Sequence, residues 1–154
     1  MGSVSSLCLA QRLDIRGRFS TMASLLRSDE PSRGHVFLVD DHHELRSNLS
    51  ELLRMSGYTV EEFDNADAFL QHHGHPMPAV VLADMHMPGK SGLQMQAQLQ
   101  SLESRLPLVF ISGGVSAAEM ELAMQQGAVG FLLKPFTRKE LCEVLDRALM
   151  PPLA

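Results

Sequence analysis

The chain has 154 residues, of which 45% are hydrophobic and 20% charged, a composition that fits one globular domain with a sizeable core. Its charge is uneven: residues 1–33 carry five arginines against three acids, a net of +2, whereas residues 34–154 carry eight cations against fifteen acids, a net of −7. An acidic body argues against direct binding to nucleic acid, and no apolar run approaches the roughly 20 residues that span a bilayer.

The first 33 residues are rich in serine and arginine and have no sustained hydrophobic period. We predict that residues 1–33 form a disordered extension, because nothing in them could bury a core. One alternative is a targeting or regulatory arm, since this composition is similar to that of a transit peptide; another is that Met22 is the true start. The domain itself is predicted over residues 34–150, with residues 151–154 as a tail.

Five short segments predict β-strands. Four are continuous apolar runs, which are typical of strands buried on both faces of a sheet. The second segment mixes polar and apolar residues and is therefore placed at or near an edge. In chain order the segments are residues 36–39, 58–63, 79–83, 108–111 and 129–133.

A helical pattern follows each of these segments. Leucines at 45, 49, 52 and 53 form one apolar face that Gly57 closes, and Asn65 can cap a short second helix. A third helix is expected from about Ser91 to Leu102. Capping-box spacing predicts the last two helices, over residues 116–126 and 137–149.

Five strands alternating with five helices predict an α/β fold of the doubly wound class. Right-handed crossovers and a body of about 120 residues favour the flavodoxin-like arrangement. This is a five-stranded parallel sheet in the order 2-1-3-4-5 with helices on both faces. The carboxyl ends of its strands would then lie at one edge.

Polar side chains stand where four of the strands end. The first strand is followed by Asp40 and Asp41, the third by Asp84, the fourth by Ser112 and the fifth by Lys134. Three crowded carboxylates need a cation to stay ionised. Hard oxygen ligands suit Mg²⁺, which typically takes one or two carboxylates, so one acid remains for another role.

The other groups indicate that role. A lysine ammonium and a small hydroxyl suit phosphoryl oxygens, and a carboxylate can itself be the nucleophile that forms an acyl phosphate. Asp84 ends the central strand and precedes the Pro88-Gly89 turn. We therefore predict that Asp84 accepts a phosphoryl group.

These motifs together resemble the receiver domain of bacterial two-component response regulators. The resemblance runs from about residue 34 to 149, and it is similar to receivers that precede LuxR-type helix-turn-helix outputs. It rests on the segments Val36 to Asp41, Asp84-Met85-His86-Met87-Pro88-Gly89-Lys90-Ser91-Gly92, Ser112-Gly113-Gly114 and Phe131-Leu132-Leu133-Lys134-Pro135-Phe136.

The resemblance implies a specific magnesium site. Asp41 and Asp84 would bind Mg²⁺ together with the backbone carbonyl of His86, and Asp40 would contribute through metal-bound water. Asp84 would receive its phosphoryl group from the phosphohistidine of a sensor histidine kinase.

The resemblance also implies a switch. Lys134 would pair with the phosphoryl group and Ser112 would hydrogen-bond to it, while Phe131 takes the position of the aromatic switch residue. The Lys134-Pro135 bond is cis in the family. Phosphorylation would change the surface of residues 116–126, 129–133 and 137–149.

The function implied is a signalling switch that catalyses its own phosphorylation and dephosphorylation and is not otherwise an enzyme. Expected partners are the kinase, a downstream effector or output domain and, on phosphorylation, a second copy of the chain. Neither a membrane nor direct nucleic-acid binding is expected. The alternatives are the receiver fragment of a longer DNA-binding transcription regulator and a phosphorelay intermediate. Cys8 and Cys142 match no disulfide or zinc spacing, which is consistent with the cytoplasm.

Two rival functions share the predicted fold. A nucleotide or flavin binder needs a glycine- or serine-rich loop after the first strand, where this chain has Asp40-Asp41-His42-His43. A phosphatase with an aspartate nucleophile usually needs a second acid two residues later, where this chain has His86. Neither rival is favoured.

Other residues receive structural interpretations. His42 and His43 are expected to open the first helix rather than to carry phosphate. Histidines 72, 73 and 75 could bind a transition metal, but a solvated loop is favoured. Met120 and Met124 have helical spacing, for which core packing is favoured over a partner-docking face.

Overall fold

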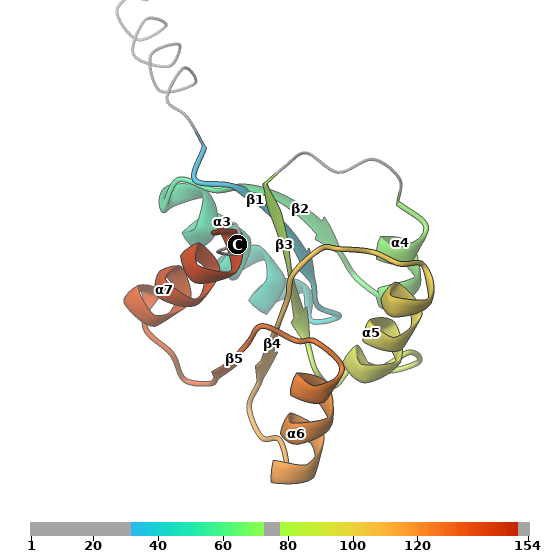
Figure 1. Ribbon diagram of the computed structural model, residues 1–154. Helices are drawn as coiled ribbons and strands as arrows, with labels where there is room; N and C mark the ends of the chain where they lie inside the picture. Colours follow the sequence, from blue (N-terminus) through green and yellow to red (C-terminus); the bar gives the residue numbers. More distant parts are fainter. Residues whose placement is uncertain (1–31, 73–77, 151–154) are drawn as a thin grey trace, which may run out of the picture. The chain divides into compact units, whose positions relative to one another are not determined.

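A computed structural model of the protein describes residues 32–72 and 78–150, and Figure 1 shows their arrangement. Predictions for residues 1–31, for His73 and His75, and for the tail at 151–154 lie outside the described residues. Among the helices of the described ranges, none is long and apolar enough to cross a membrane.

The described residues form five strands and five helices that alternate along the chain. The strands are β1 (His35–Val39), β2 (Thr59–Phe63), β3 (Ala79–Asp84), β4 (Leu108–Ser112) and β5 (Gly130–Leu133). The helices are α3 (His43–Met55), α4 (Ala66–Leu70), α5 (Gly92–Ser101), α6 (Ala117–Gln125) and α7 (Arg138–Leu149). All strand pairs are parallel and their order is β2-β1-β3-β4-β5, which confirms the predicted flavodoxin-like sheet.

The helices cover both faces of the sheet, α3 and α7 on one and α4, α5 and α6 on the other (Figure 1). Alternate residues of a strand point to opposite faces, so Val36 and Leu38 pack toward α3 and α7, and Phe37 and Val39 toward the other three helices. The helices contribute Leu53, Leu141 and Leu145 to the first core and Phe69, Met95, Leu99 and Ala123 to the second.

Side-chain caps start four of the helices. The capping boxes predicted for α6 and α7 are present, and α5 has a third one that the sequence analysis missed. In this box the Ser91 hydroxyl accepts from the Gln94 N–H at 3.2 Å, and the Gln94 side chain accepts from the Ser91 N–H at 2.8 Å. The predicted cap of α4 is also present, because Asn65 Oδ1 accepts from the Ala68 N–H at 2.7 Å.

Two predicted core positions are wrong. Leu45, assigned to the apolar face of the first helix, is 46% exposed. It lies in the first turn of α3, which begins beyond the end of β1 and therefore extends past the core. Met124 is also 46% exposed, because α6 fully buries only the small side chain of Ala123, whereas Met120 is half-buried.

Arg33 belongs to the compact unit although the predicted extension included it. Its guanidinium donates to the Ser56 carbonyl at 2.9 Å, pairs with the Asp146 carboxylate, and lies 4.9 Å from the centre of the Tyr58 ring. The Tyr58 hydroxyl donates to Asp146 as well, at 2.5 Å. The compact unit therefore begins at Ser32, before the start of β1.

Candidate functional site

The register of the sheet brings the predicted site residues to one edge. Val39 is paired with Ala83, so Asp40 and Asp84 follow at the same level of neighbouring strands. Asp84 is paired with Ile111, which places Ser112 one residue further along β4. Ser112 is paired in turn with Leu133, so Lys134 lies one residue beyond it. This edge is where open α/β sheets bind ligands.

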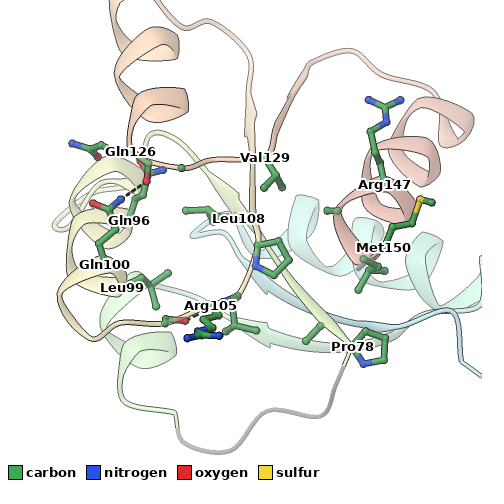
Figure 2. A pocket seen from close by; sticks show the side chains of 17 residues that line it. Pro78, Gln96, Leu99, Gln100, Arg105, Leu108, Gln126, Val129, Arg147 and Met150 are labelled. Atoms are coloured by element: carbon green, nitrogen blue, oxygen red, sulfur yellow. Dashed lines mark hydrogen bonds between the residues drawn. The ribbon is translucent and has the colours of Figure 1, made fainter. Parts of the chain in front are cut away.

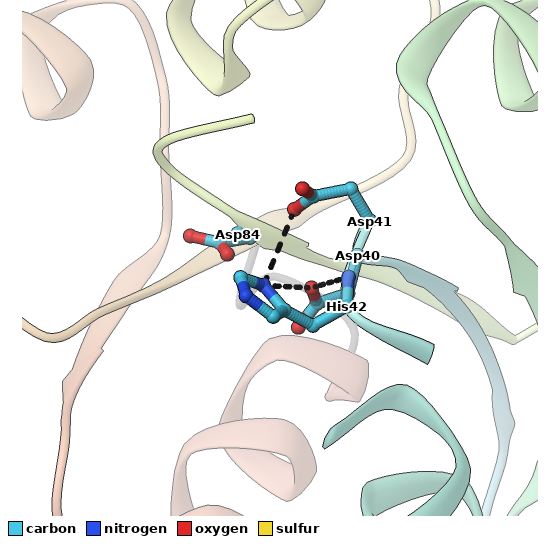
Figure 3. A group of neighbouring side chains, drawn as sticks. All are labelled: Asp40, Asp41, His42 and Asp84. Atoms are coloured by element: carbon cyan, nitrogen blue, oxygen red, sulfur yellow. Dashed lines mark hydrogen bonds and ion pairs between the residues drawn. The ribbon is translucent and has the colours of Figure 1, made fainter. Parts of the chain in front are cut away.

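Three acidic side chains and one histidine meet there (Figure 3). Asp40, Asp41, His42 and Asp84 each offer a ligand atom, and these atoms all lie within 4.8 Å of one another. Asp40 and Asp84 are buried, at 3% and 7% exposure, whereas Asp41 is half-buried and His42 exposed. The structure thus brings together the three predicted carboxylates.

Asp84 is a buried carboxylate in an unfavourable environment. Burial raises the pKa of its carboxyl group above the ordinary value, and the negative charges of Asp40 and Asp41 raise it further. The His86 N–H, which donates to Asp84 Oδ1 at 3.1 Å, and the positive charge of Lys134 lower it. The net shift of the pKa is upward, and a cation bound beside Asp84 would favour its ionised form.

The acidic group fits Mg²⁺ by its chemistry. Three of its four donors, those of Asp40, Asp41 and Asp84, are hard carboxylate oxygens, which this ion prefers. Asp41 Oδ1 is buried and accepts no hydrogen bond, which is costly for a carboxylate unless a cation compensates it. Asp41 and Asp84 are therefore suited to hold such an ion.

Ser112 and Lys134, the other two predicted site residues, differ in burial and in their hydrogen bonds. Ser112 is fully buried, and its hydroxyl donates to the Gly114 carbonyl at 2.9 Å and accepts from the Gly114 N–H at 3.1 Å. Lys134 is half-buried, and its backbone N–H donates to the backbone carbonyl of Ser112 at 2.9 Å. The positive charge of Lys134 lowers the pKa of Asp84 in this arrangement. The Ser112 hydroxyl, in contrast, forms its hydrogen bonds with Gly114.

Phe131 lies on β5, two residues before the end of the strand. Its ring is half-buried and packs against Phe110, with ring centres 5.5 Å apart. The Lys134-Pro135 bond that follows β5 is cis, as the family resemblance implied.

Two histidine contacts at this edge were missed by the sequence analysis. His42 does precede α3 as expected, but its imidazole faces Asp40 and Asp41. His86 Nε2 lies 3.2 Å from Glu119 Oε1, which joins the loop after Asp84 to the start of α6. The Ser116 N–H, and then His86, lower the pKa of Glu119. No sequence spacing predicts a contact between residues so far apart in the chain.

A cavity of about 1010 Å³ lies at the opposite edge of the sheet, beside the starts of β4 and β5 (Figure 2). The described residues that line it are mainly apolar and include Leu99, Leu108 and Val129. Two arginines, at positions 105 and 147, also line it. The described lining residues include no acid or histidine and none of the predicted site residues. The chemistry predicted for this chain therefore belongs to the acidic edge.

Comparison with known proteins identifies the family to which most of the described residues belong. Residues 36–146 match the family described as the response regulator receiver domain. The chain is 35% identical over 114 residues to the response regulator protein TodT of Pseudomonas putida, covering 74% of this chain and 50% of that protein. It is 31% identical over 118 residues to the transcriptional regulatory protein FixJ of Bradyrhizobium diazoefficiens, covering 77% and 58%.

Solved structures are similar as well. The crystal structure of FixJ-N has a TM-score of 0.72 and 30% identity, covering 81% of this chain and 98% of that one. The chemotaxis protein CheY4 of Vibrio cholerae has a TM-score of 0.64 and 28% identity, covering 75% and 98%. The chain spans about half the length of the curated relatives it matches.

Proposed function

Because the chain belongs to the response regulator receiver family of two-component signalling, we propose that it is switched by phosphorylation of Asp84. The observation that carries this assignment is the buried Asp84 carboxylate, which ends the central strand beside two other acids and within reach of the Lys134 charge. A carboxylate in this position is costly for stability, so its presence favours a functional role.

Mg²⁺ is the cofactor that we propose for the acidic group. Asp41, Asp84 and the His86 carbonyl would hold it directly, and Asp40 through metal-bound water. When bound, the ion neutralises the carboxylates and the charge on the phosphoryl oxygens.

The proposed reaction is phosphoryl transfer from a kinase phosphohistidine. An Asp84 oxygen forms the new P–O bond while the P–N bond breaks, and the electron pair stays on the imidazole nitrogen, which takes up a proton. Lys134 pairs with the phosphoryl oxygens. Since Gly114 engages the Ser112 hydroxyl, this hydroxyl must leave its loop to reach the phosphoryl group.

The output would follow from the movement of Ser112 and Lys134. Ser112 ends β4 and Lys134 directly follows β5, and these strands adjoin α6 and α7. Drawing the two residues toward Asp84 would shift the equilibrium between two arrangements of these elements, and Phe131 would move with them. The surface formed by α6, β5 and the segment between them carries exposed apolar side chains that suit an effector or a second copy of the chain. These are Leu122, Met124, Val129 and Leu133.

We propose that the chain is the receiver part of a longer transcription regulator that works in the cytoplasm with a sensor histidine kinase. The similarity to FixJ, a transcriptional regulatory protein, and the match to about half the length of the relatives favour this proposal over a stand-alone phosphorelay intermediate. An output part, rather than the acidic receiver, would bind the DNA. The receiver itself catalyses only its own phosphorylation and dephosphorylation.

Acetyl phosphate tests the proposed acceptor without knowledge of the kinase. The full chain, incubated with acetyl phosphate and Mg²⁺, should gain one phosphoryl group by intact-mass analysis. Hydroxylamine should remove that group, as expected of an acyl phosphate, and peptide mapping should place it on Asp84. A label on another residue, or no label, would overturn the assignment.

Replacing Lys134 by Gln should slow labelling by acetyl phosphate about 100-fold, because the phosphoryl oxygens lose their positioned cation. Mg²⁺ binding, measured by calorimetry, should persist because the carboxylates remain. Lys139→Gln is the matched control, since Lys139 is an exposed lysine on α7. Equal labelling rates for the two variants would contradict the role of Lys134.

A further inference from the structure

The His42 side chain is directed to the acidic group and not to helix capping. His42 is the N-cap residue of α3, yet its side chain makes no capping hydrogen bond. Instead Nδ1 lies 3.7 Å from Asp41 Oδ1 and 4.0 Å from Asp40 Oδ1 (Figure 3). The His42 N–H donates to Asp40 Oδ1 at 2.9 Å, which holds the residue beside the group.

The spacing of these atoms is close to that of a metal site. Two ligands on opposite sides of a divalent ion, each about 2.1 Å from it, are about 4.2 Å apart. Adjacent ligands of such an ion are about 3.0–3.4 Å apart. The ligand atoms of Asp40, Asp41, His42 and Asp84 lie within 4.8 Å of one another, so the side chains would close around an ion by moving inward about 1 Å. Asp41 Oδ1 breaks no hydrogen bond when it turns toward an ion.

We propose that His42 makes this edge a mixed nitrogen and oxygen site that holds an imidazole-binding divalent ion of the Ni²⁺ and Zn²⁺ class. Mg²⁺ takes oxygen ligands, whereas Ni²⁺ and Zn²⁺ accept imidazole and bind a given site more tightly. An ion held by His42 and Asp41 occupies the carboxylates assigned to Mg²⁺ and excludes it. This inference rests on the metal site of the proposed function.

His43 provides a matched comparison one residue away. It is also exposed, but its Nδ1 lies 3.3 Å from an Arg46 guanidinium nitrogen. It is not part of the acidic group. The two histidines therefore share sequence context and solvent exposure and differ in whether they face the carboxylates.

Calorimetric titration of the full chain with Ni²⁺ and with Mg²⁺ tests the proposal. All proteins carry His73→Gln and His75→Gln, because a histidine-rich run would bind the same ions. Adding His42→Gln should weaken Ni²⁺ binding at least about tenfold and leave Mg²⁺ binding within about twofold. Adding His43→Gln should change neither. Unchanged Ni²⁺ affinity in the His42 variant would overturn the proposal.

A second measurement does not depend on the His42 variant. In the protein that carries only the His73→Gln and His75→Gln substitutions, substoichiometric Ni²⁺ should broaden the ring-proton NMR signals of His42 before those of His43, and excess Mg²⁺ should reverse this. Equal broadening would overturn the role of His42. Failure of Mg²⁺ to bind, with no effect of Asp41→Asn, would instead contradict the metal site of the proposed function.

Discussion

Replacing Asp84 by Asn is expected to abolish labelling by acetyl phosphate and to raise the stability of the metal-free protein. Asn has nearly the shape of Asp but lacks the nucleophilic carboxylate. Its amide oxygen can still accept the His86 N–H, which Asp84 accepts at 3.1 Å. The substitution also removes a desolvated negative charge that lies beside Asp40 and Asp41.

The stability gain should depend on pH. The pKa of Asp84 is raised above its value in the unfolded chain, so its folded-state environment favours the protonated form. The contribution of Asp84 to stability is therefore fully present below the ordinary carboxyl pKa and is lost as the pH rises through the raised value. Asn has no such loss, so its advantage should appear near neutral pH and shrink toward about pH 4.

Thermal unfolding in EDTA measures this advantage. The midpoint of Asp84→Asn should exceed that of the wild type by about 2–5 °C at pH 7. Asp64→Asn is the control, because Asp64 is exposed just after β2 and outside the acidic group. It should label normally and unfold as the wild type does. A lower unfolding midpoint for Asp84→Asn at neutral pH would contradict the inference that the ionised Asp84 carboxylate destabilises the metal-free protein.

Replacing Gly92 by Ala should destabilise the fold by about 1–3 kcal/mol and slow phosphorylation. A Cβ at this first residue of α5 would lie 2.9 Å from the Asp84 carbonyl oxygen and 3.0 Å from Met85 Cα. It would also lie 2.7 Å from the Phe110 ring. Two of these contacts are backbone at the end of β3, so the methyl group must displace the segment that positions the phosphoryl acceptor.

Urea unfolding and the acetyl phosphate labelling rate test this effect. Gly114→Ala is the stability control, because a Cβ there meets nothing within 4 Å and the backbone has no positive φ. Its free energy of unfolding should stay within about 0.5 kcal/mol of the wild type. If Gly92→Ala is equally stable and labels at the wild-type rate, the close approach of α5 to Asp84 does not constrain the site.

The amino-acid sequence by itself determined the elements and the sheet order, and it predicted which polar residues lie together at one edge of the sheet. Continuous apolar runs can be buried only between two helical layers, and alternation with helices requires parallel strands. Parallel strands bring their carboxyl ends together, so Asp40, Asp84 and Lys134 could be grouped from their positions along the chain. The caps of α4, α6 and α7 were equally predictable, because each cap uses residues three apart.

Only the tertiary structure decided contacts that depend on how distant segments approach one another. Leu45 and Met124 fit a helical apolar pattern, but their exposure depends on where α3 begins relative to the sheet and on the small Ala123 contact of α6. The side-chain directions of His42 and His86 follow from the packing of whole elements. Local spacing fixes which residues share a face or an edge, whereas the distances between their atoms arise from the assembled core.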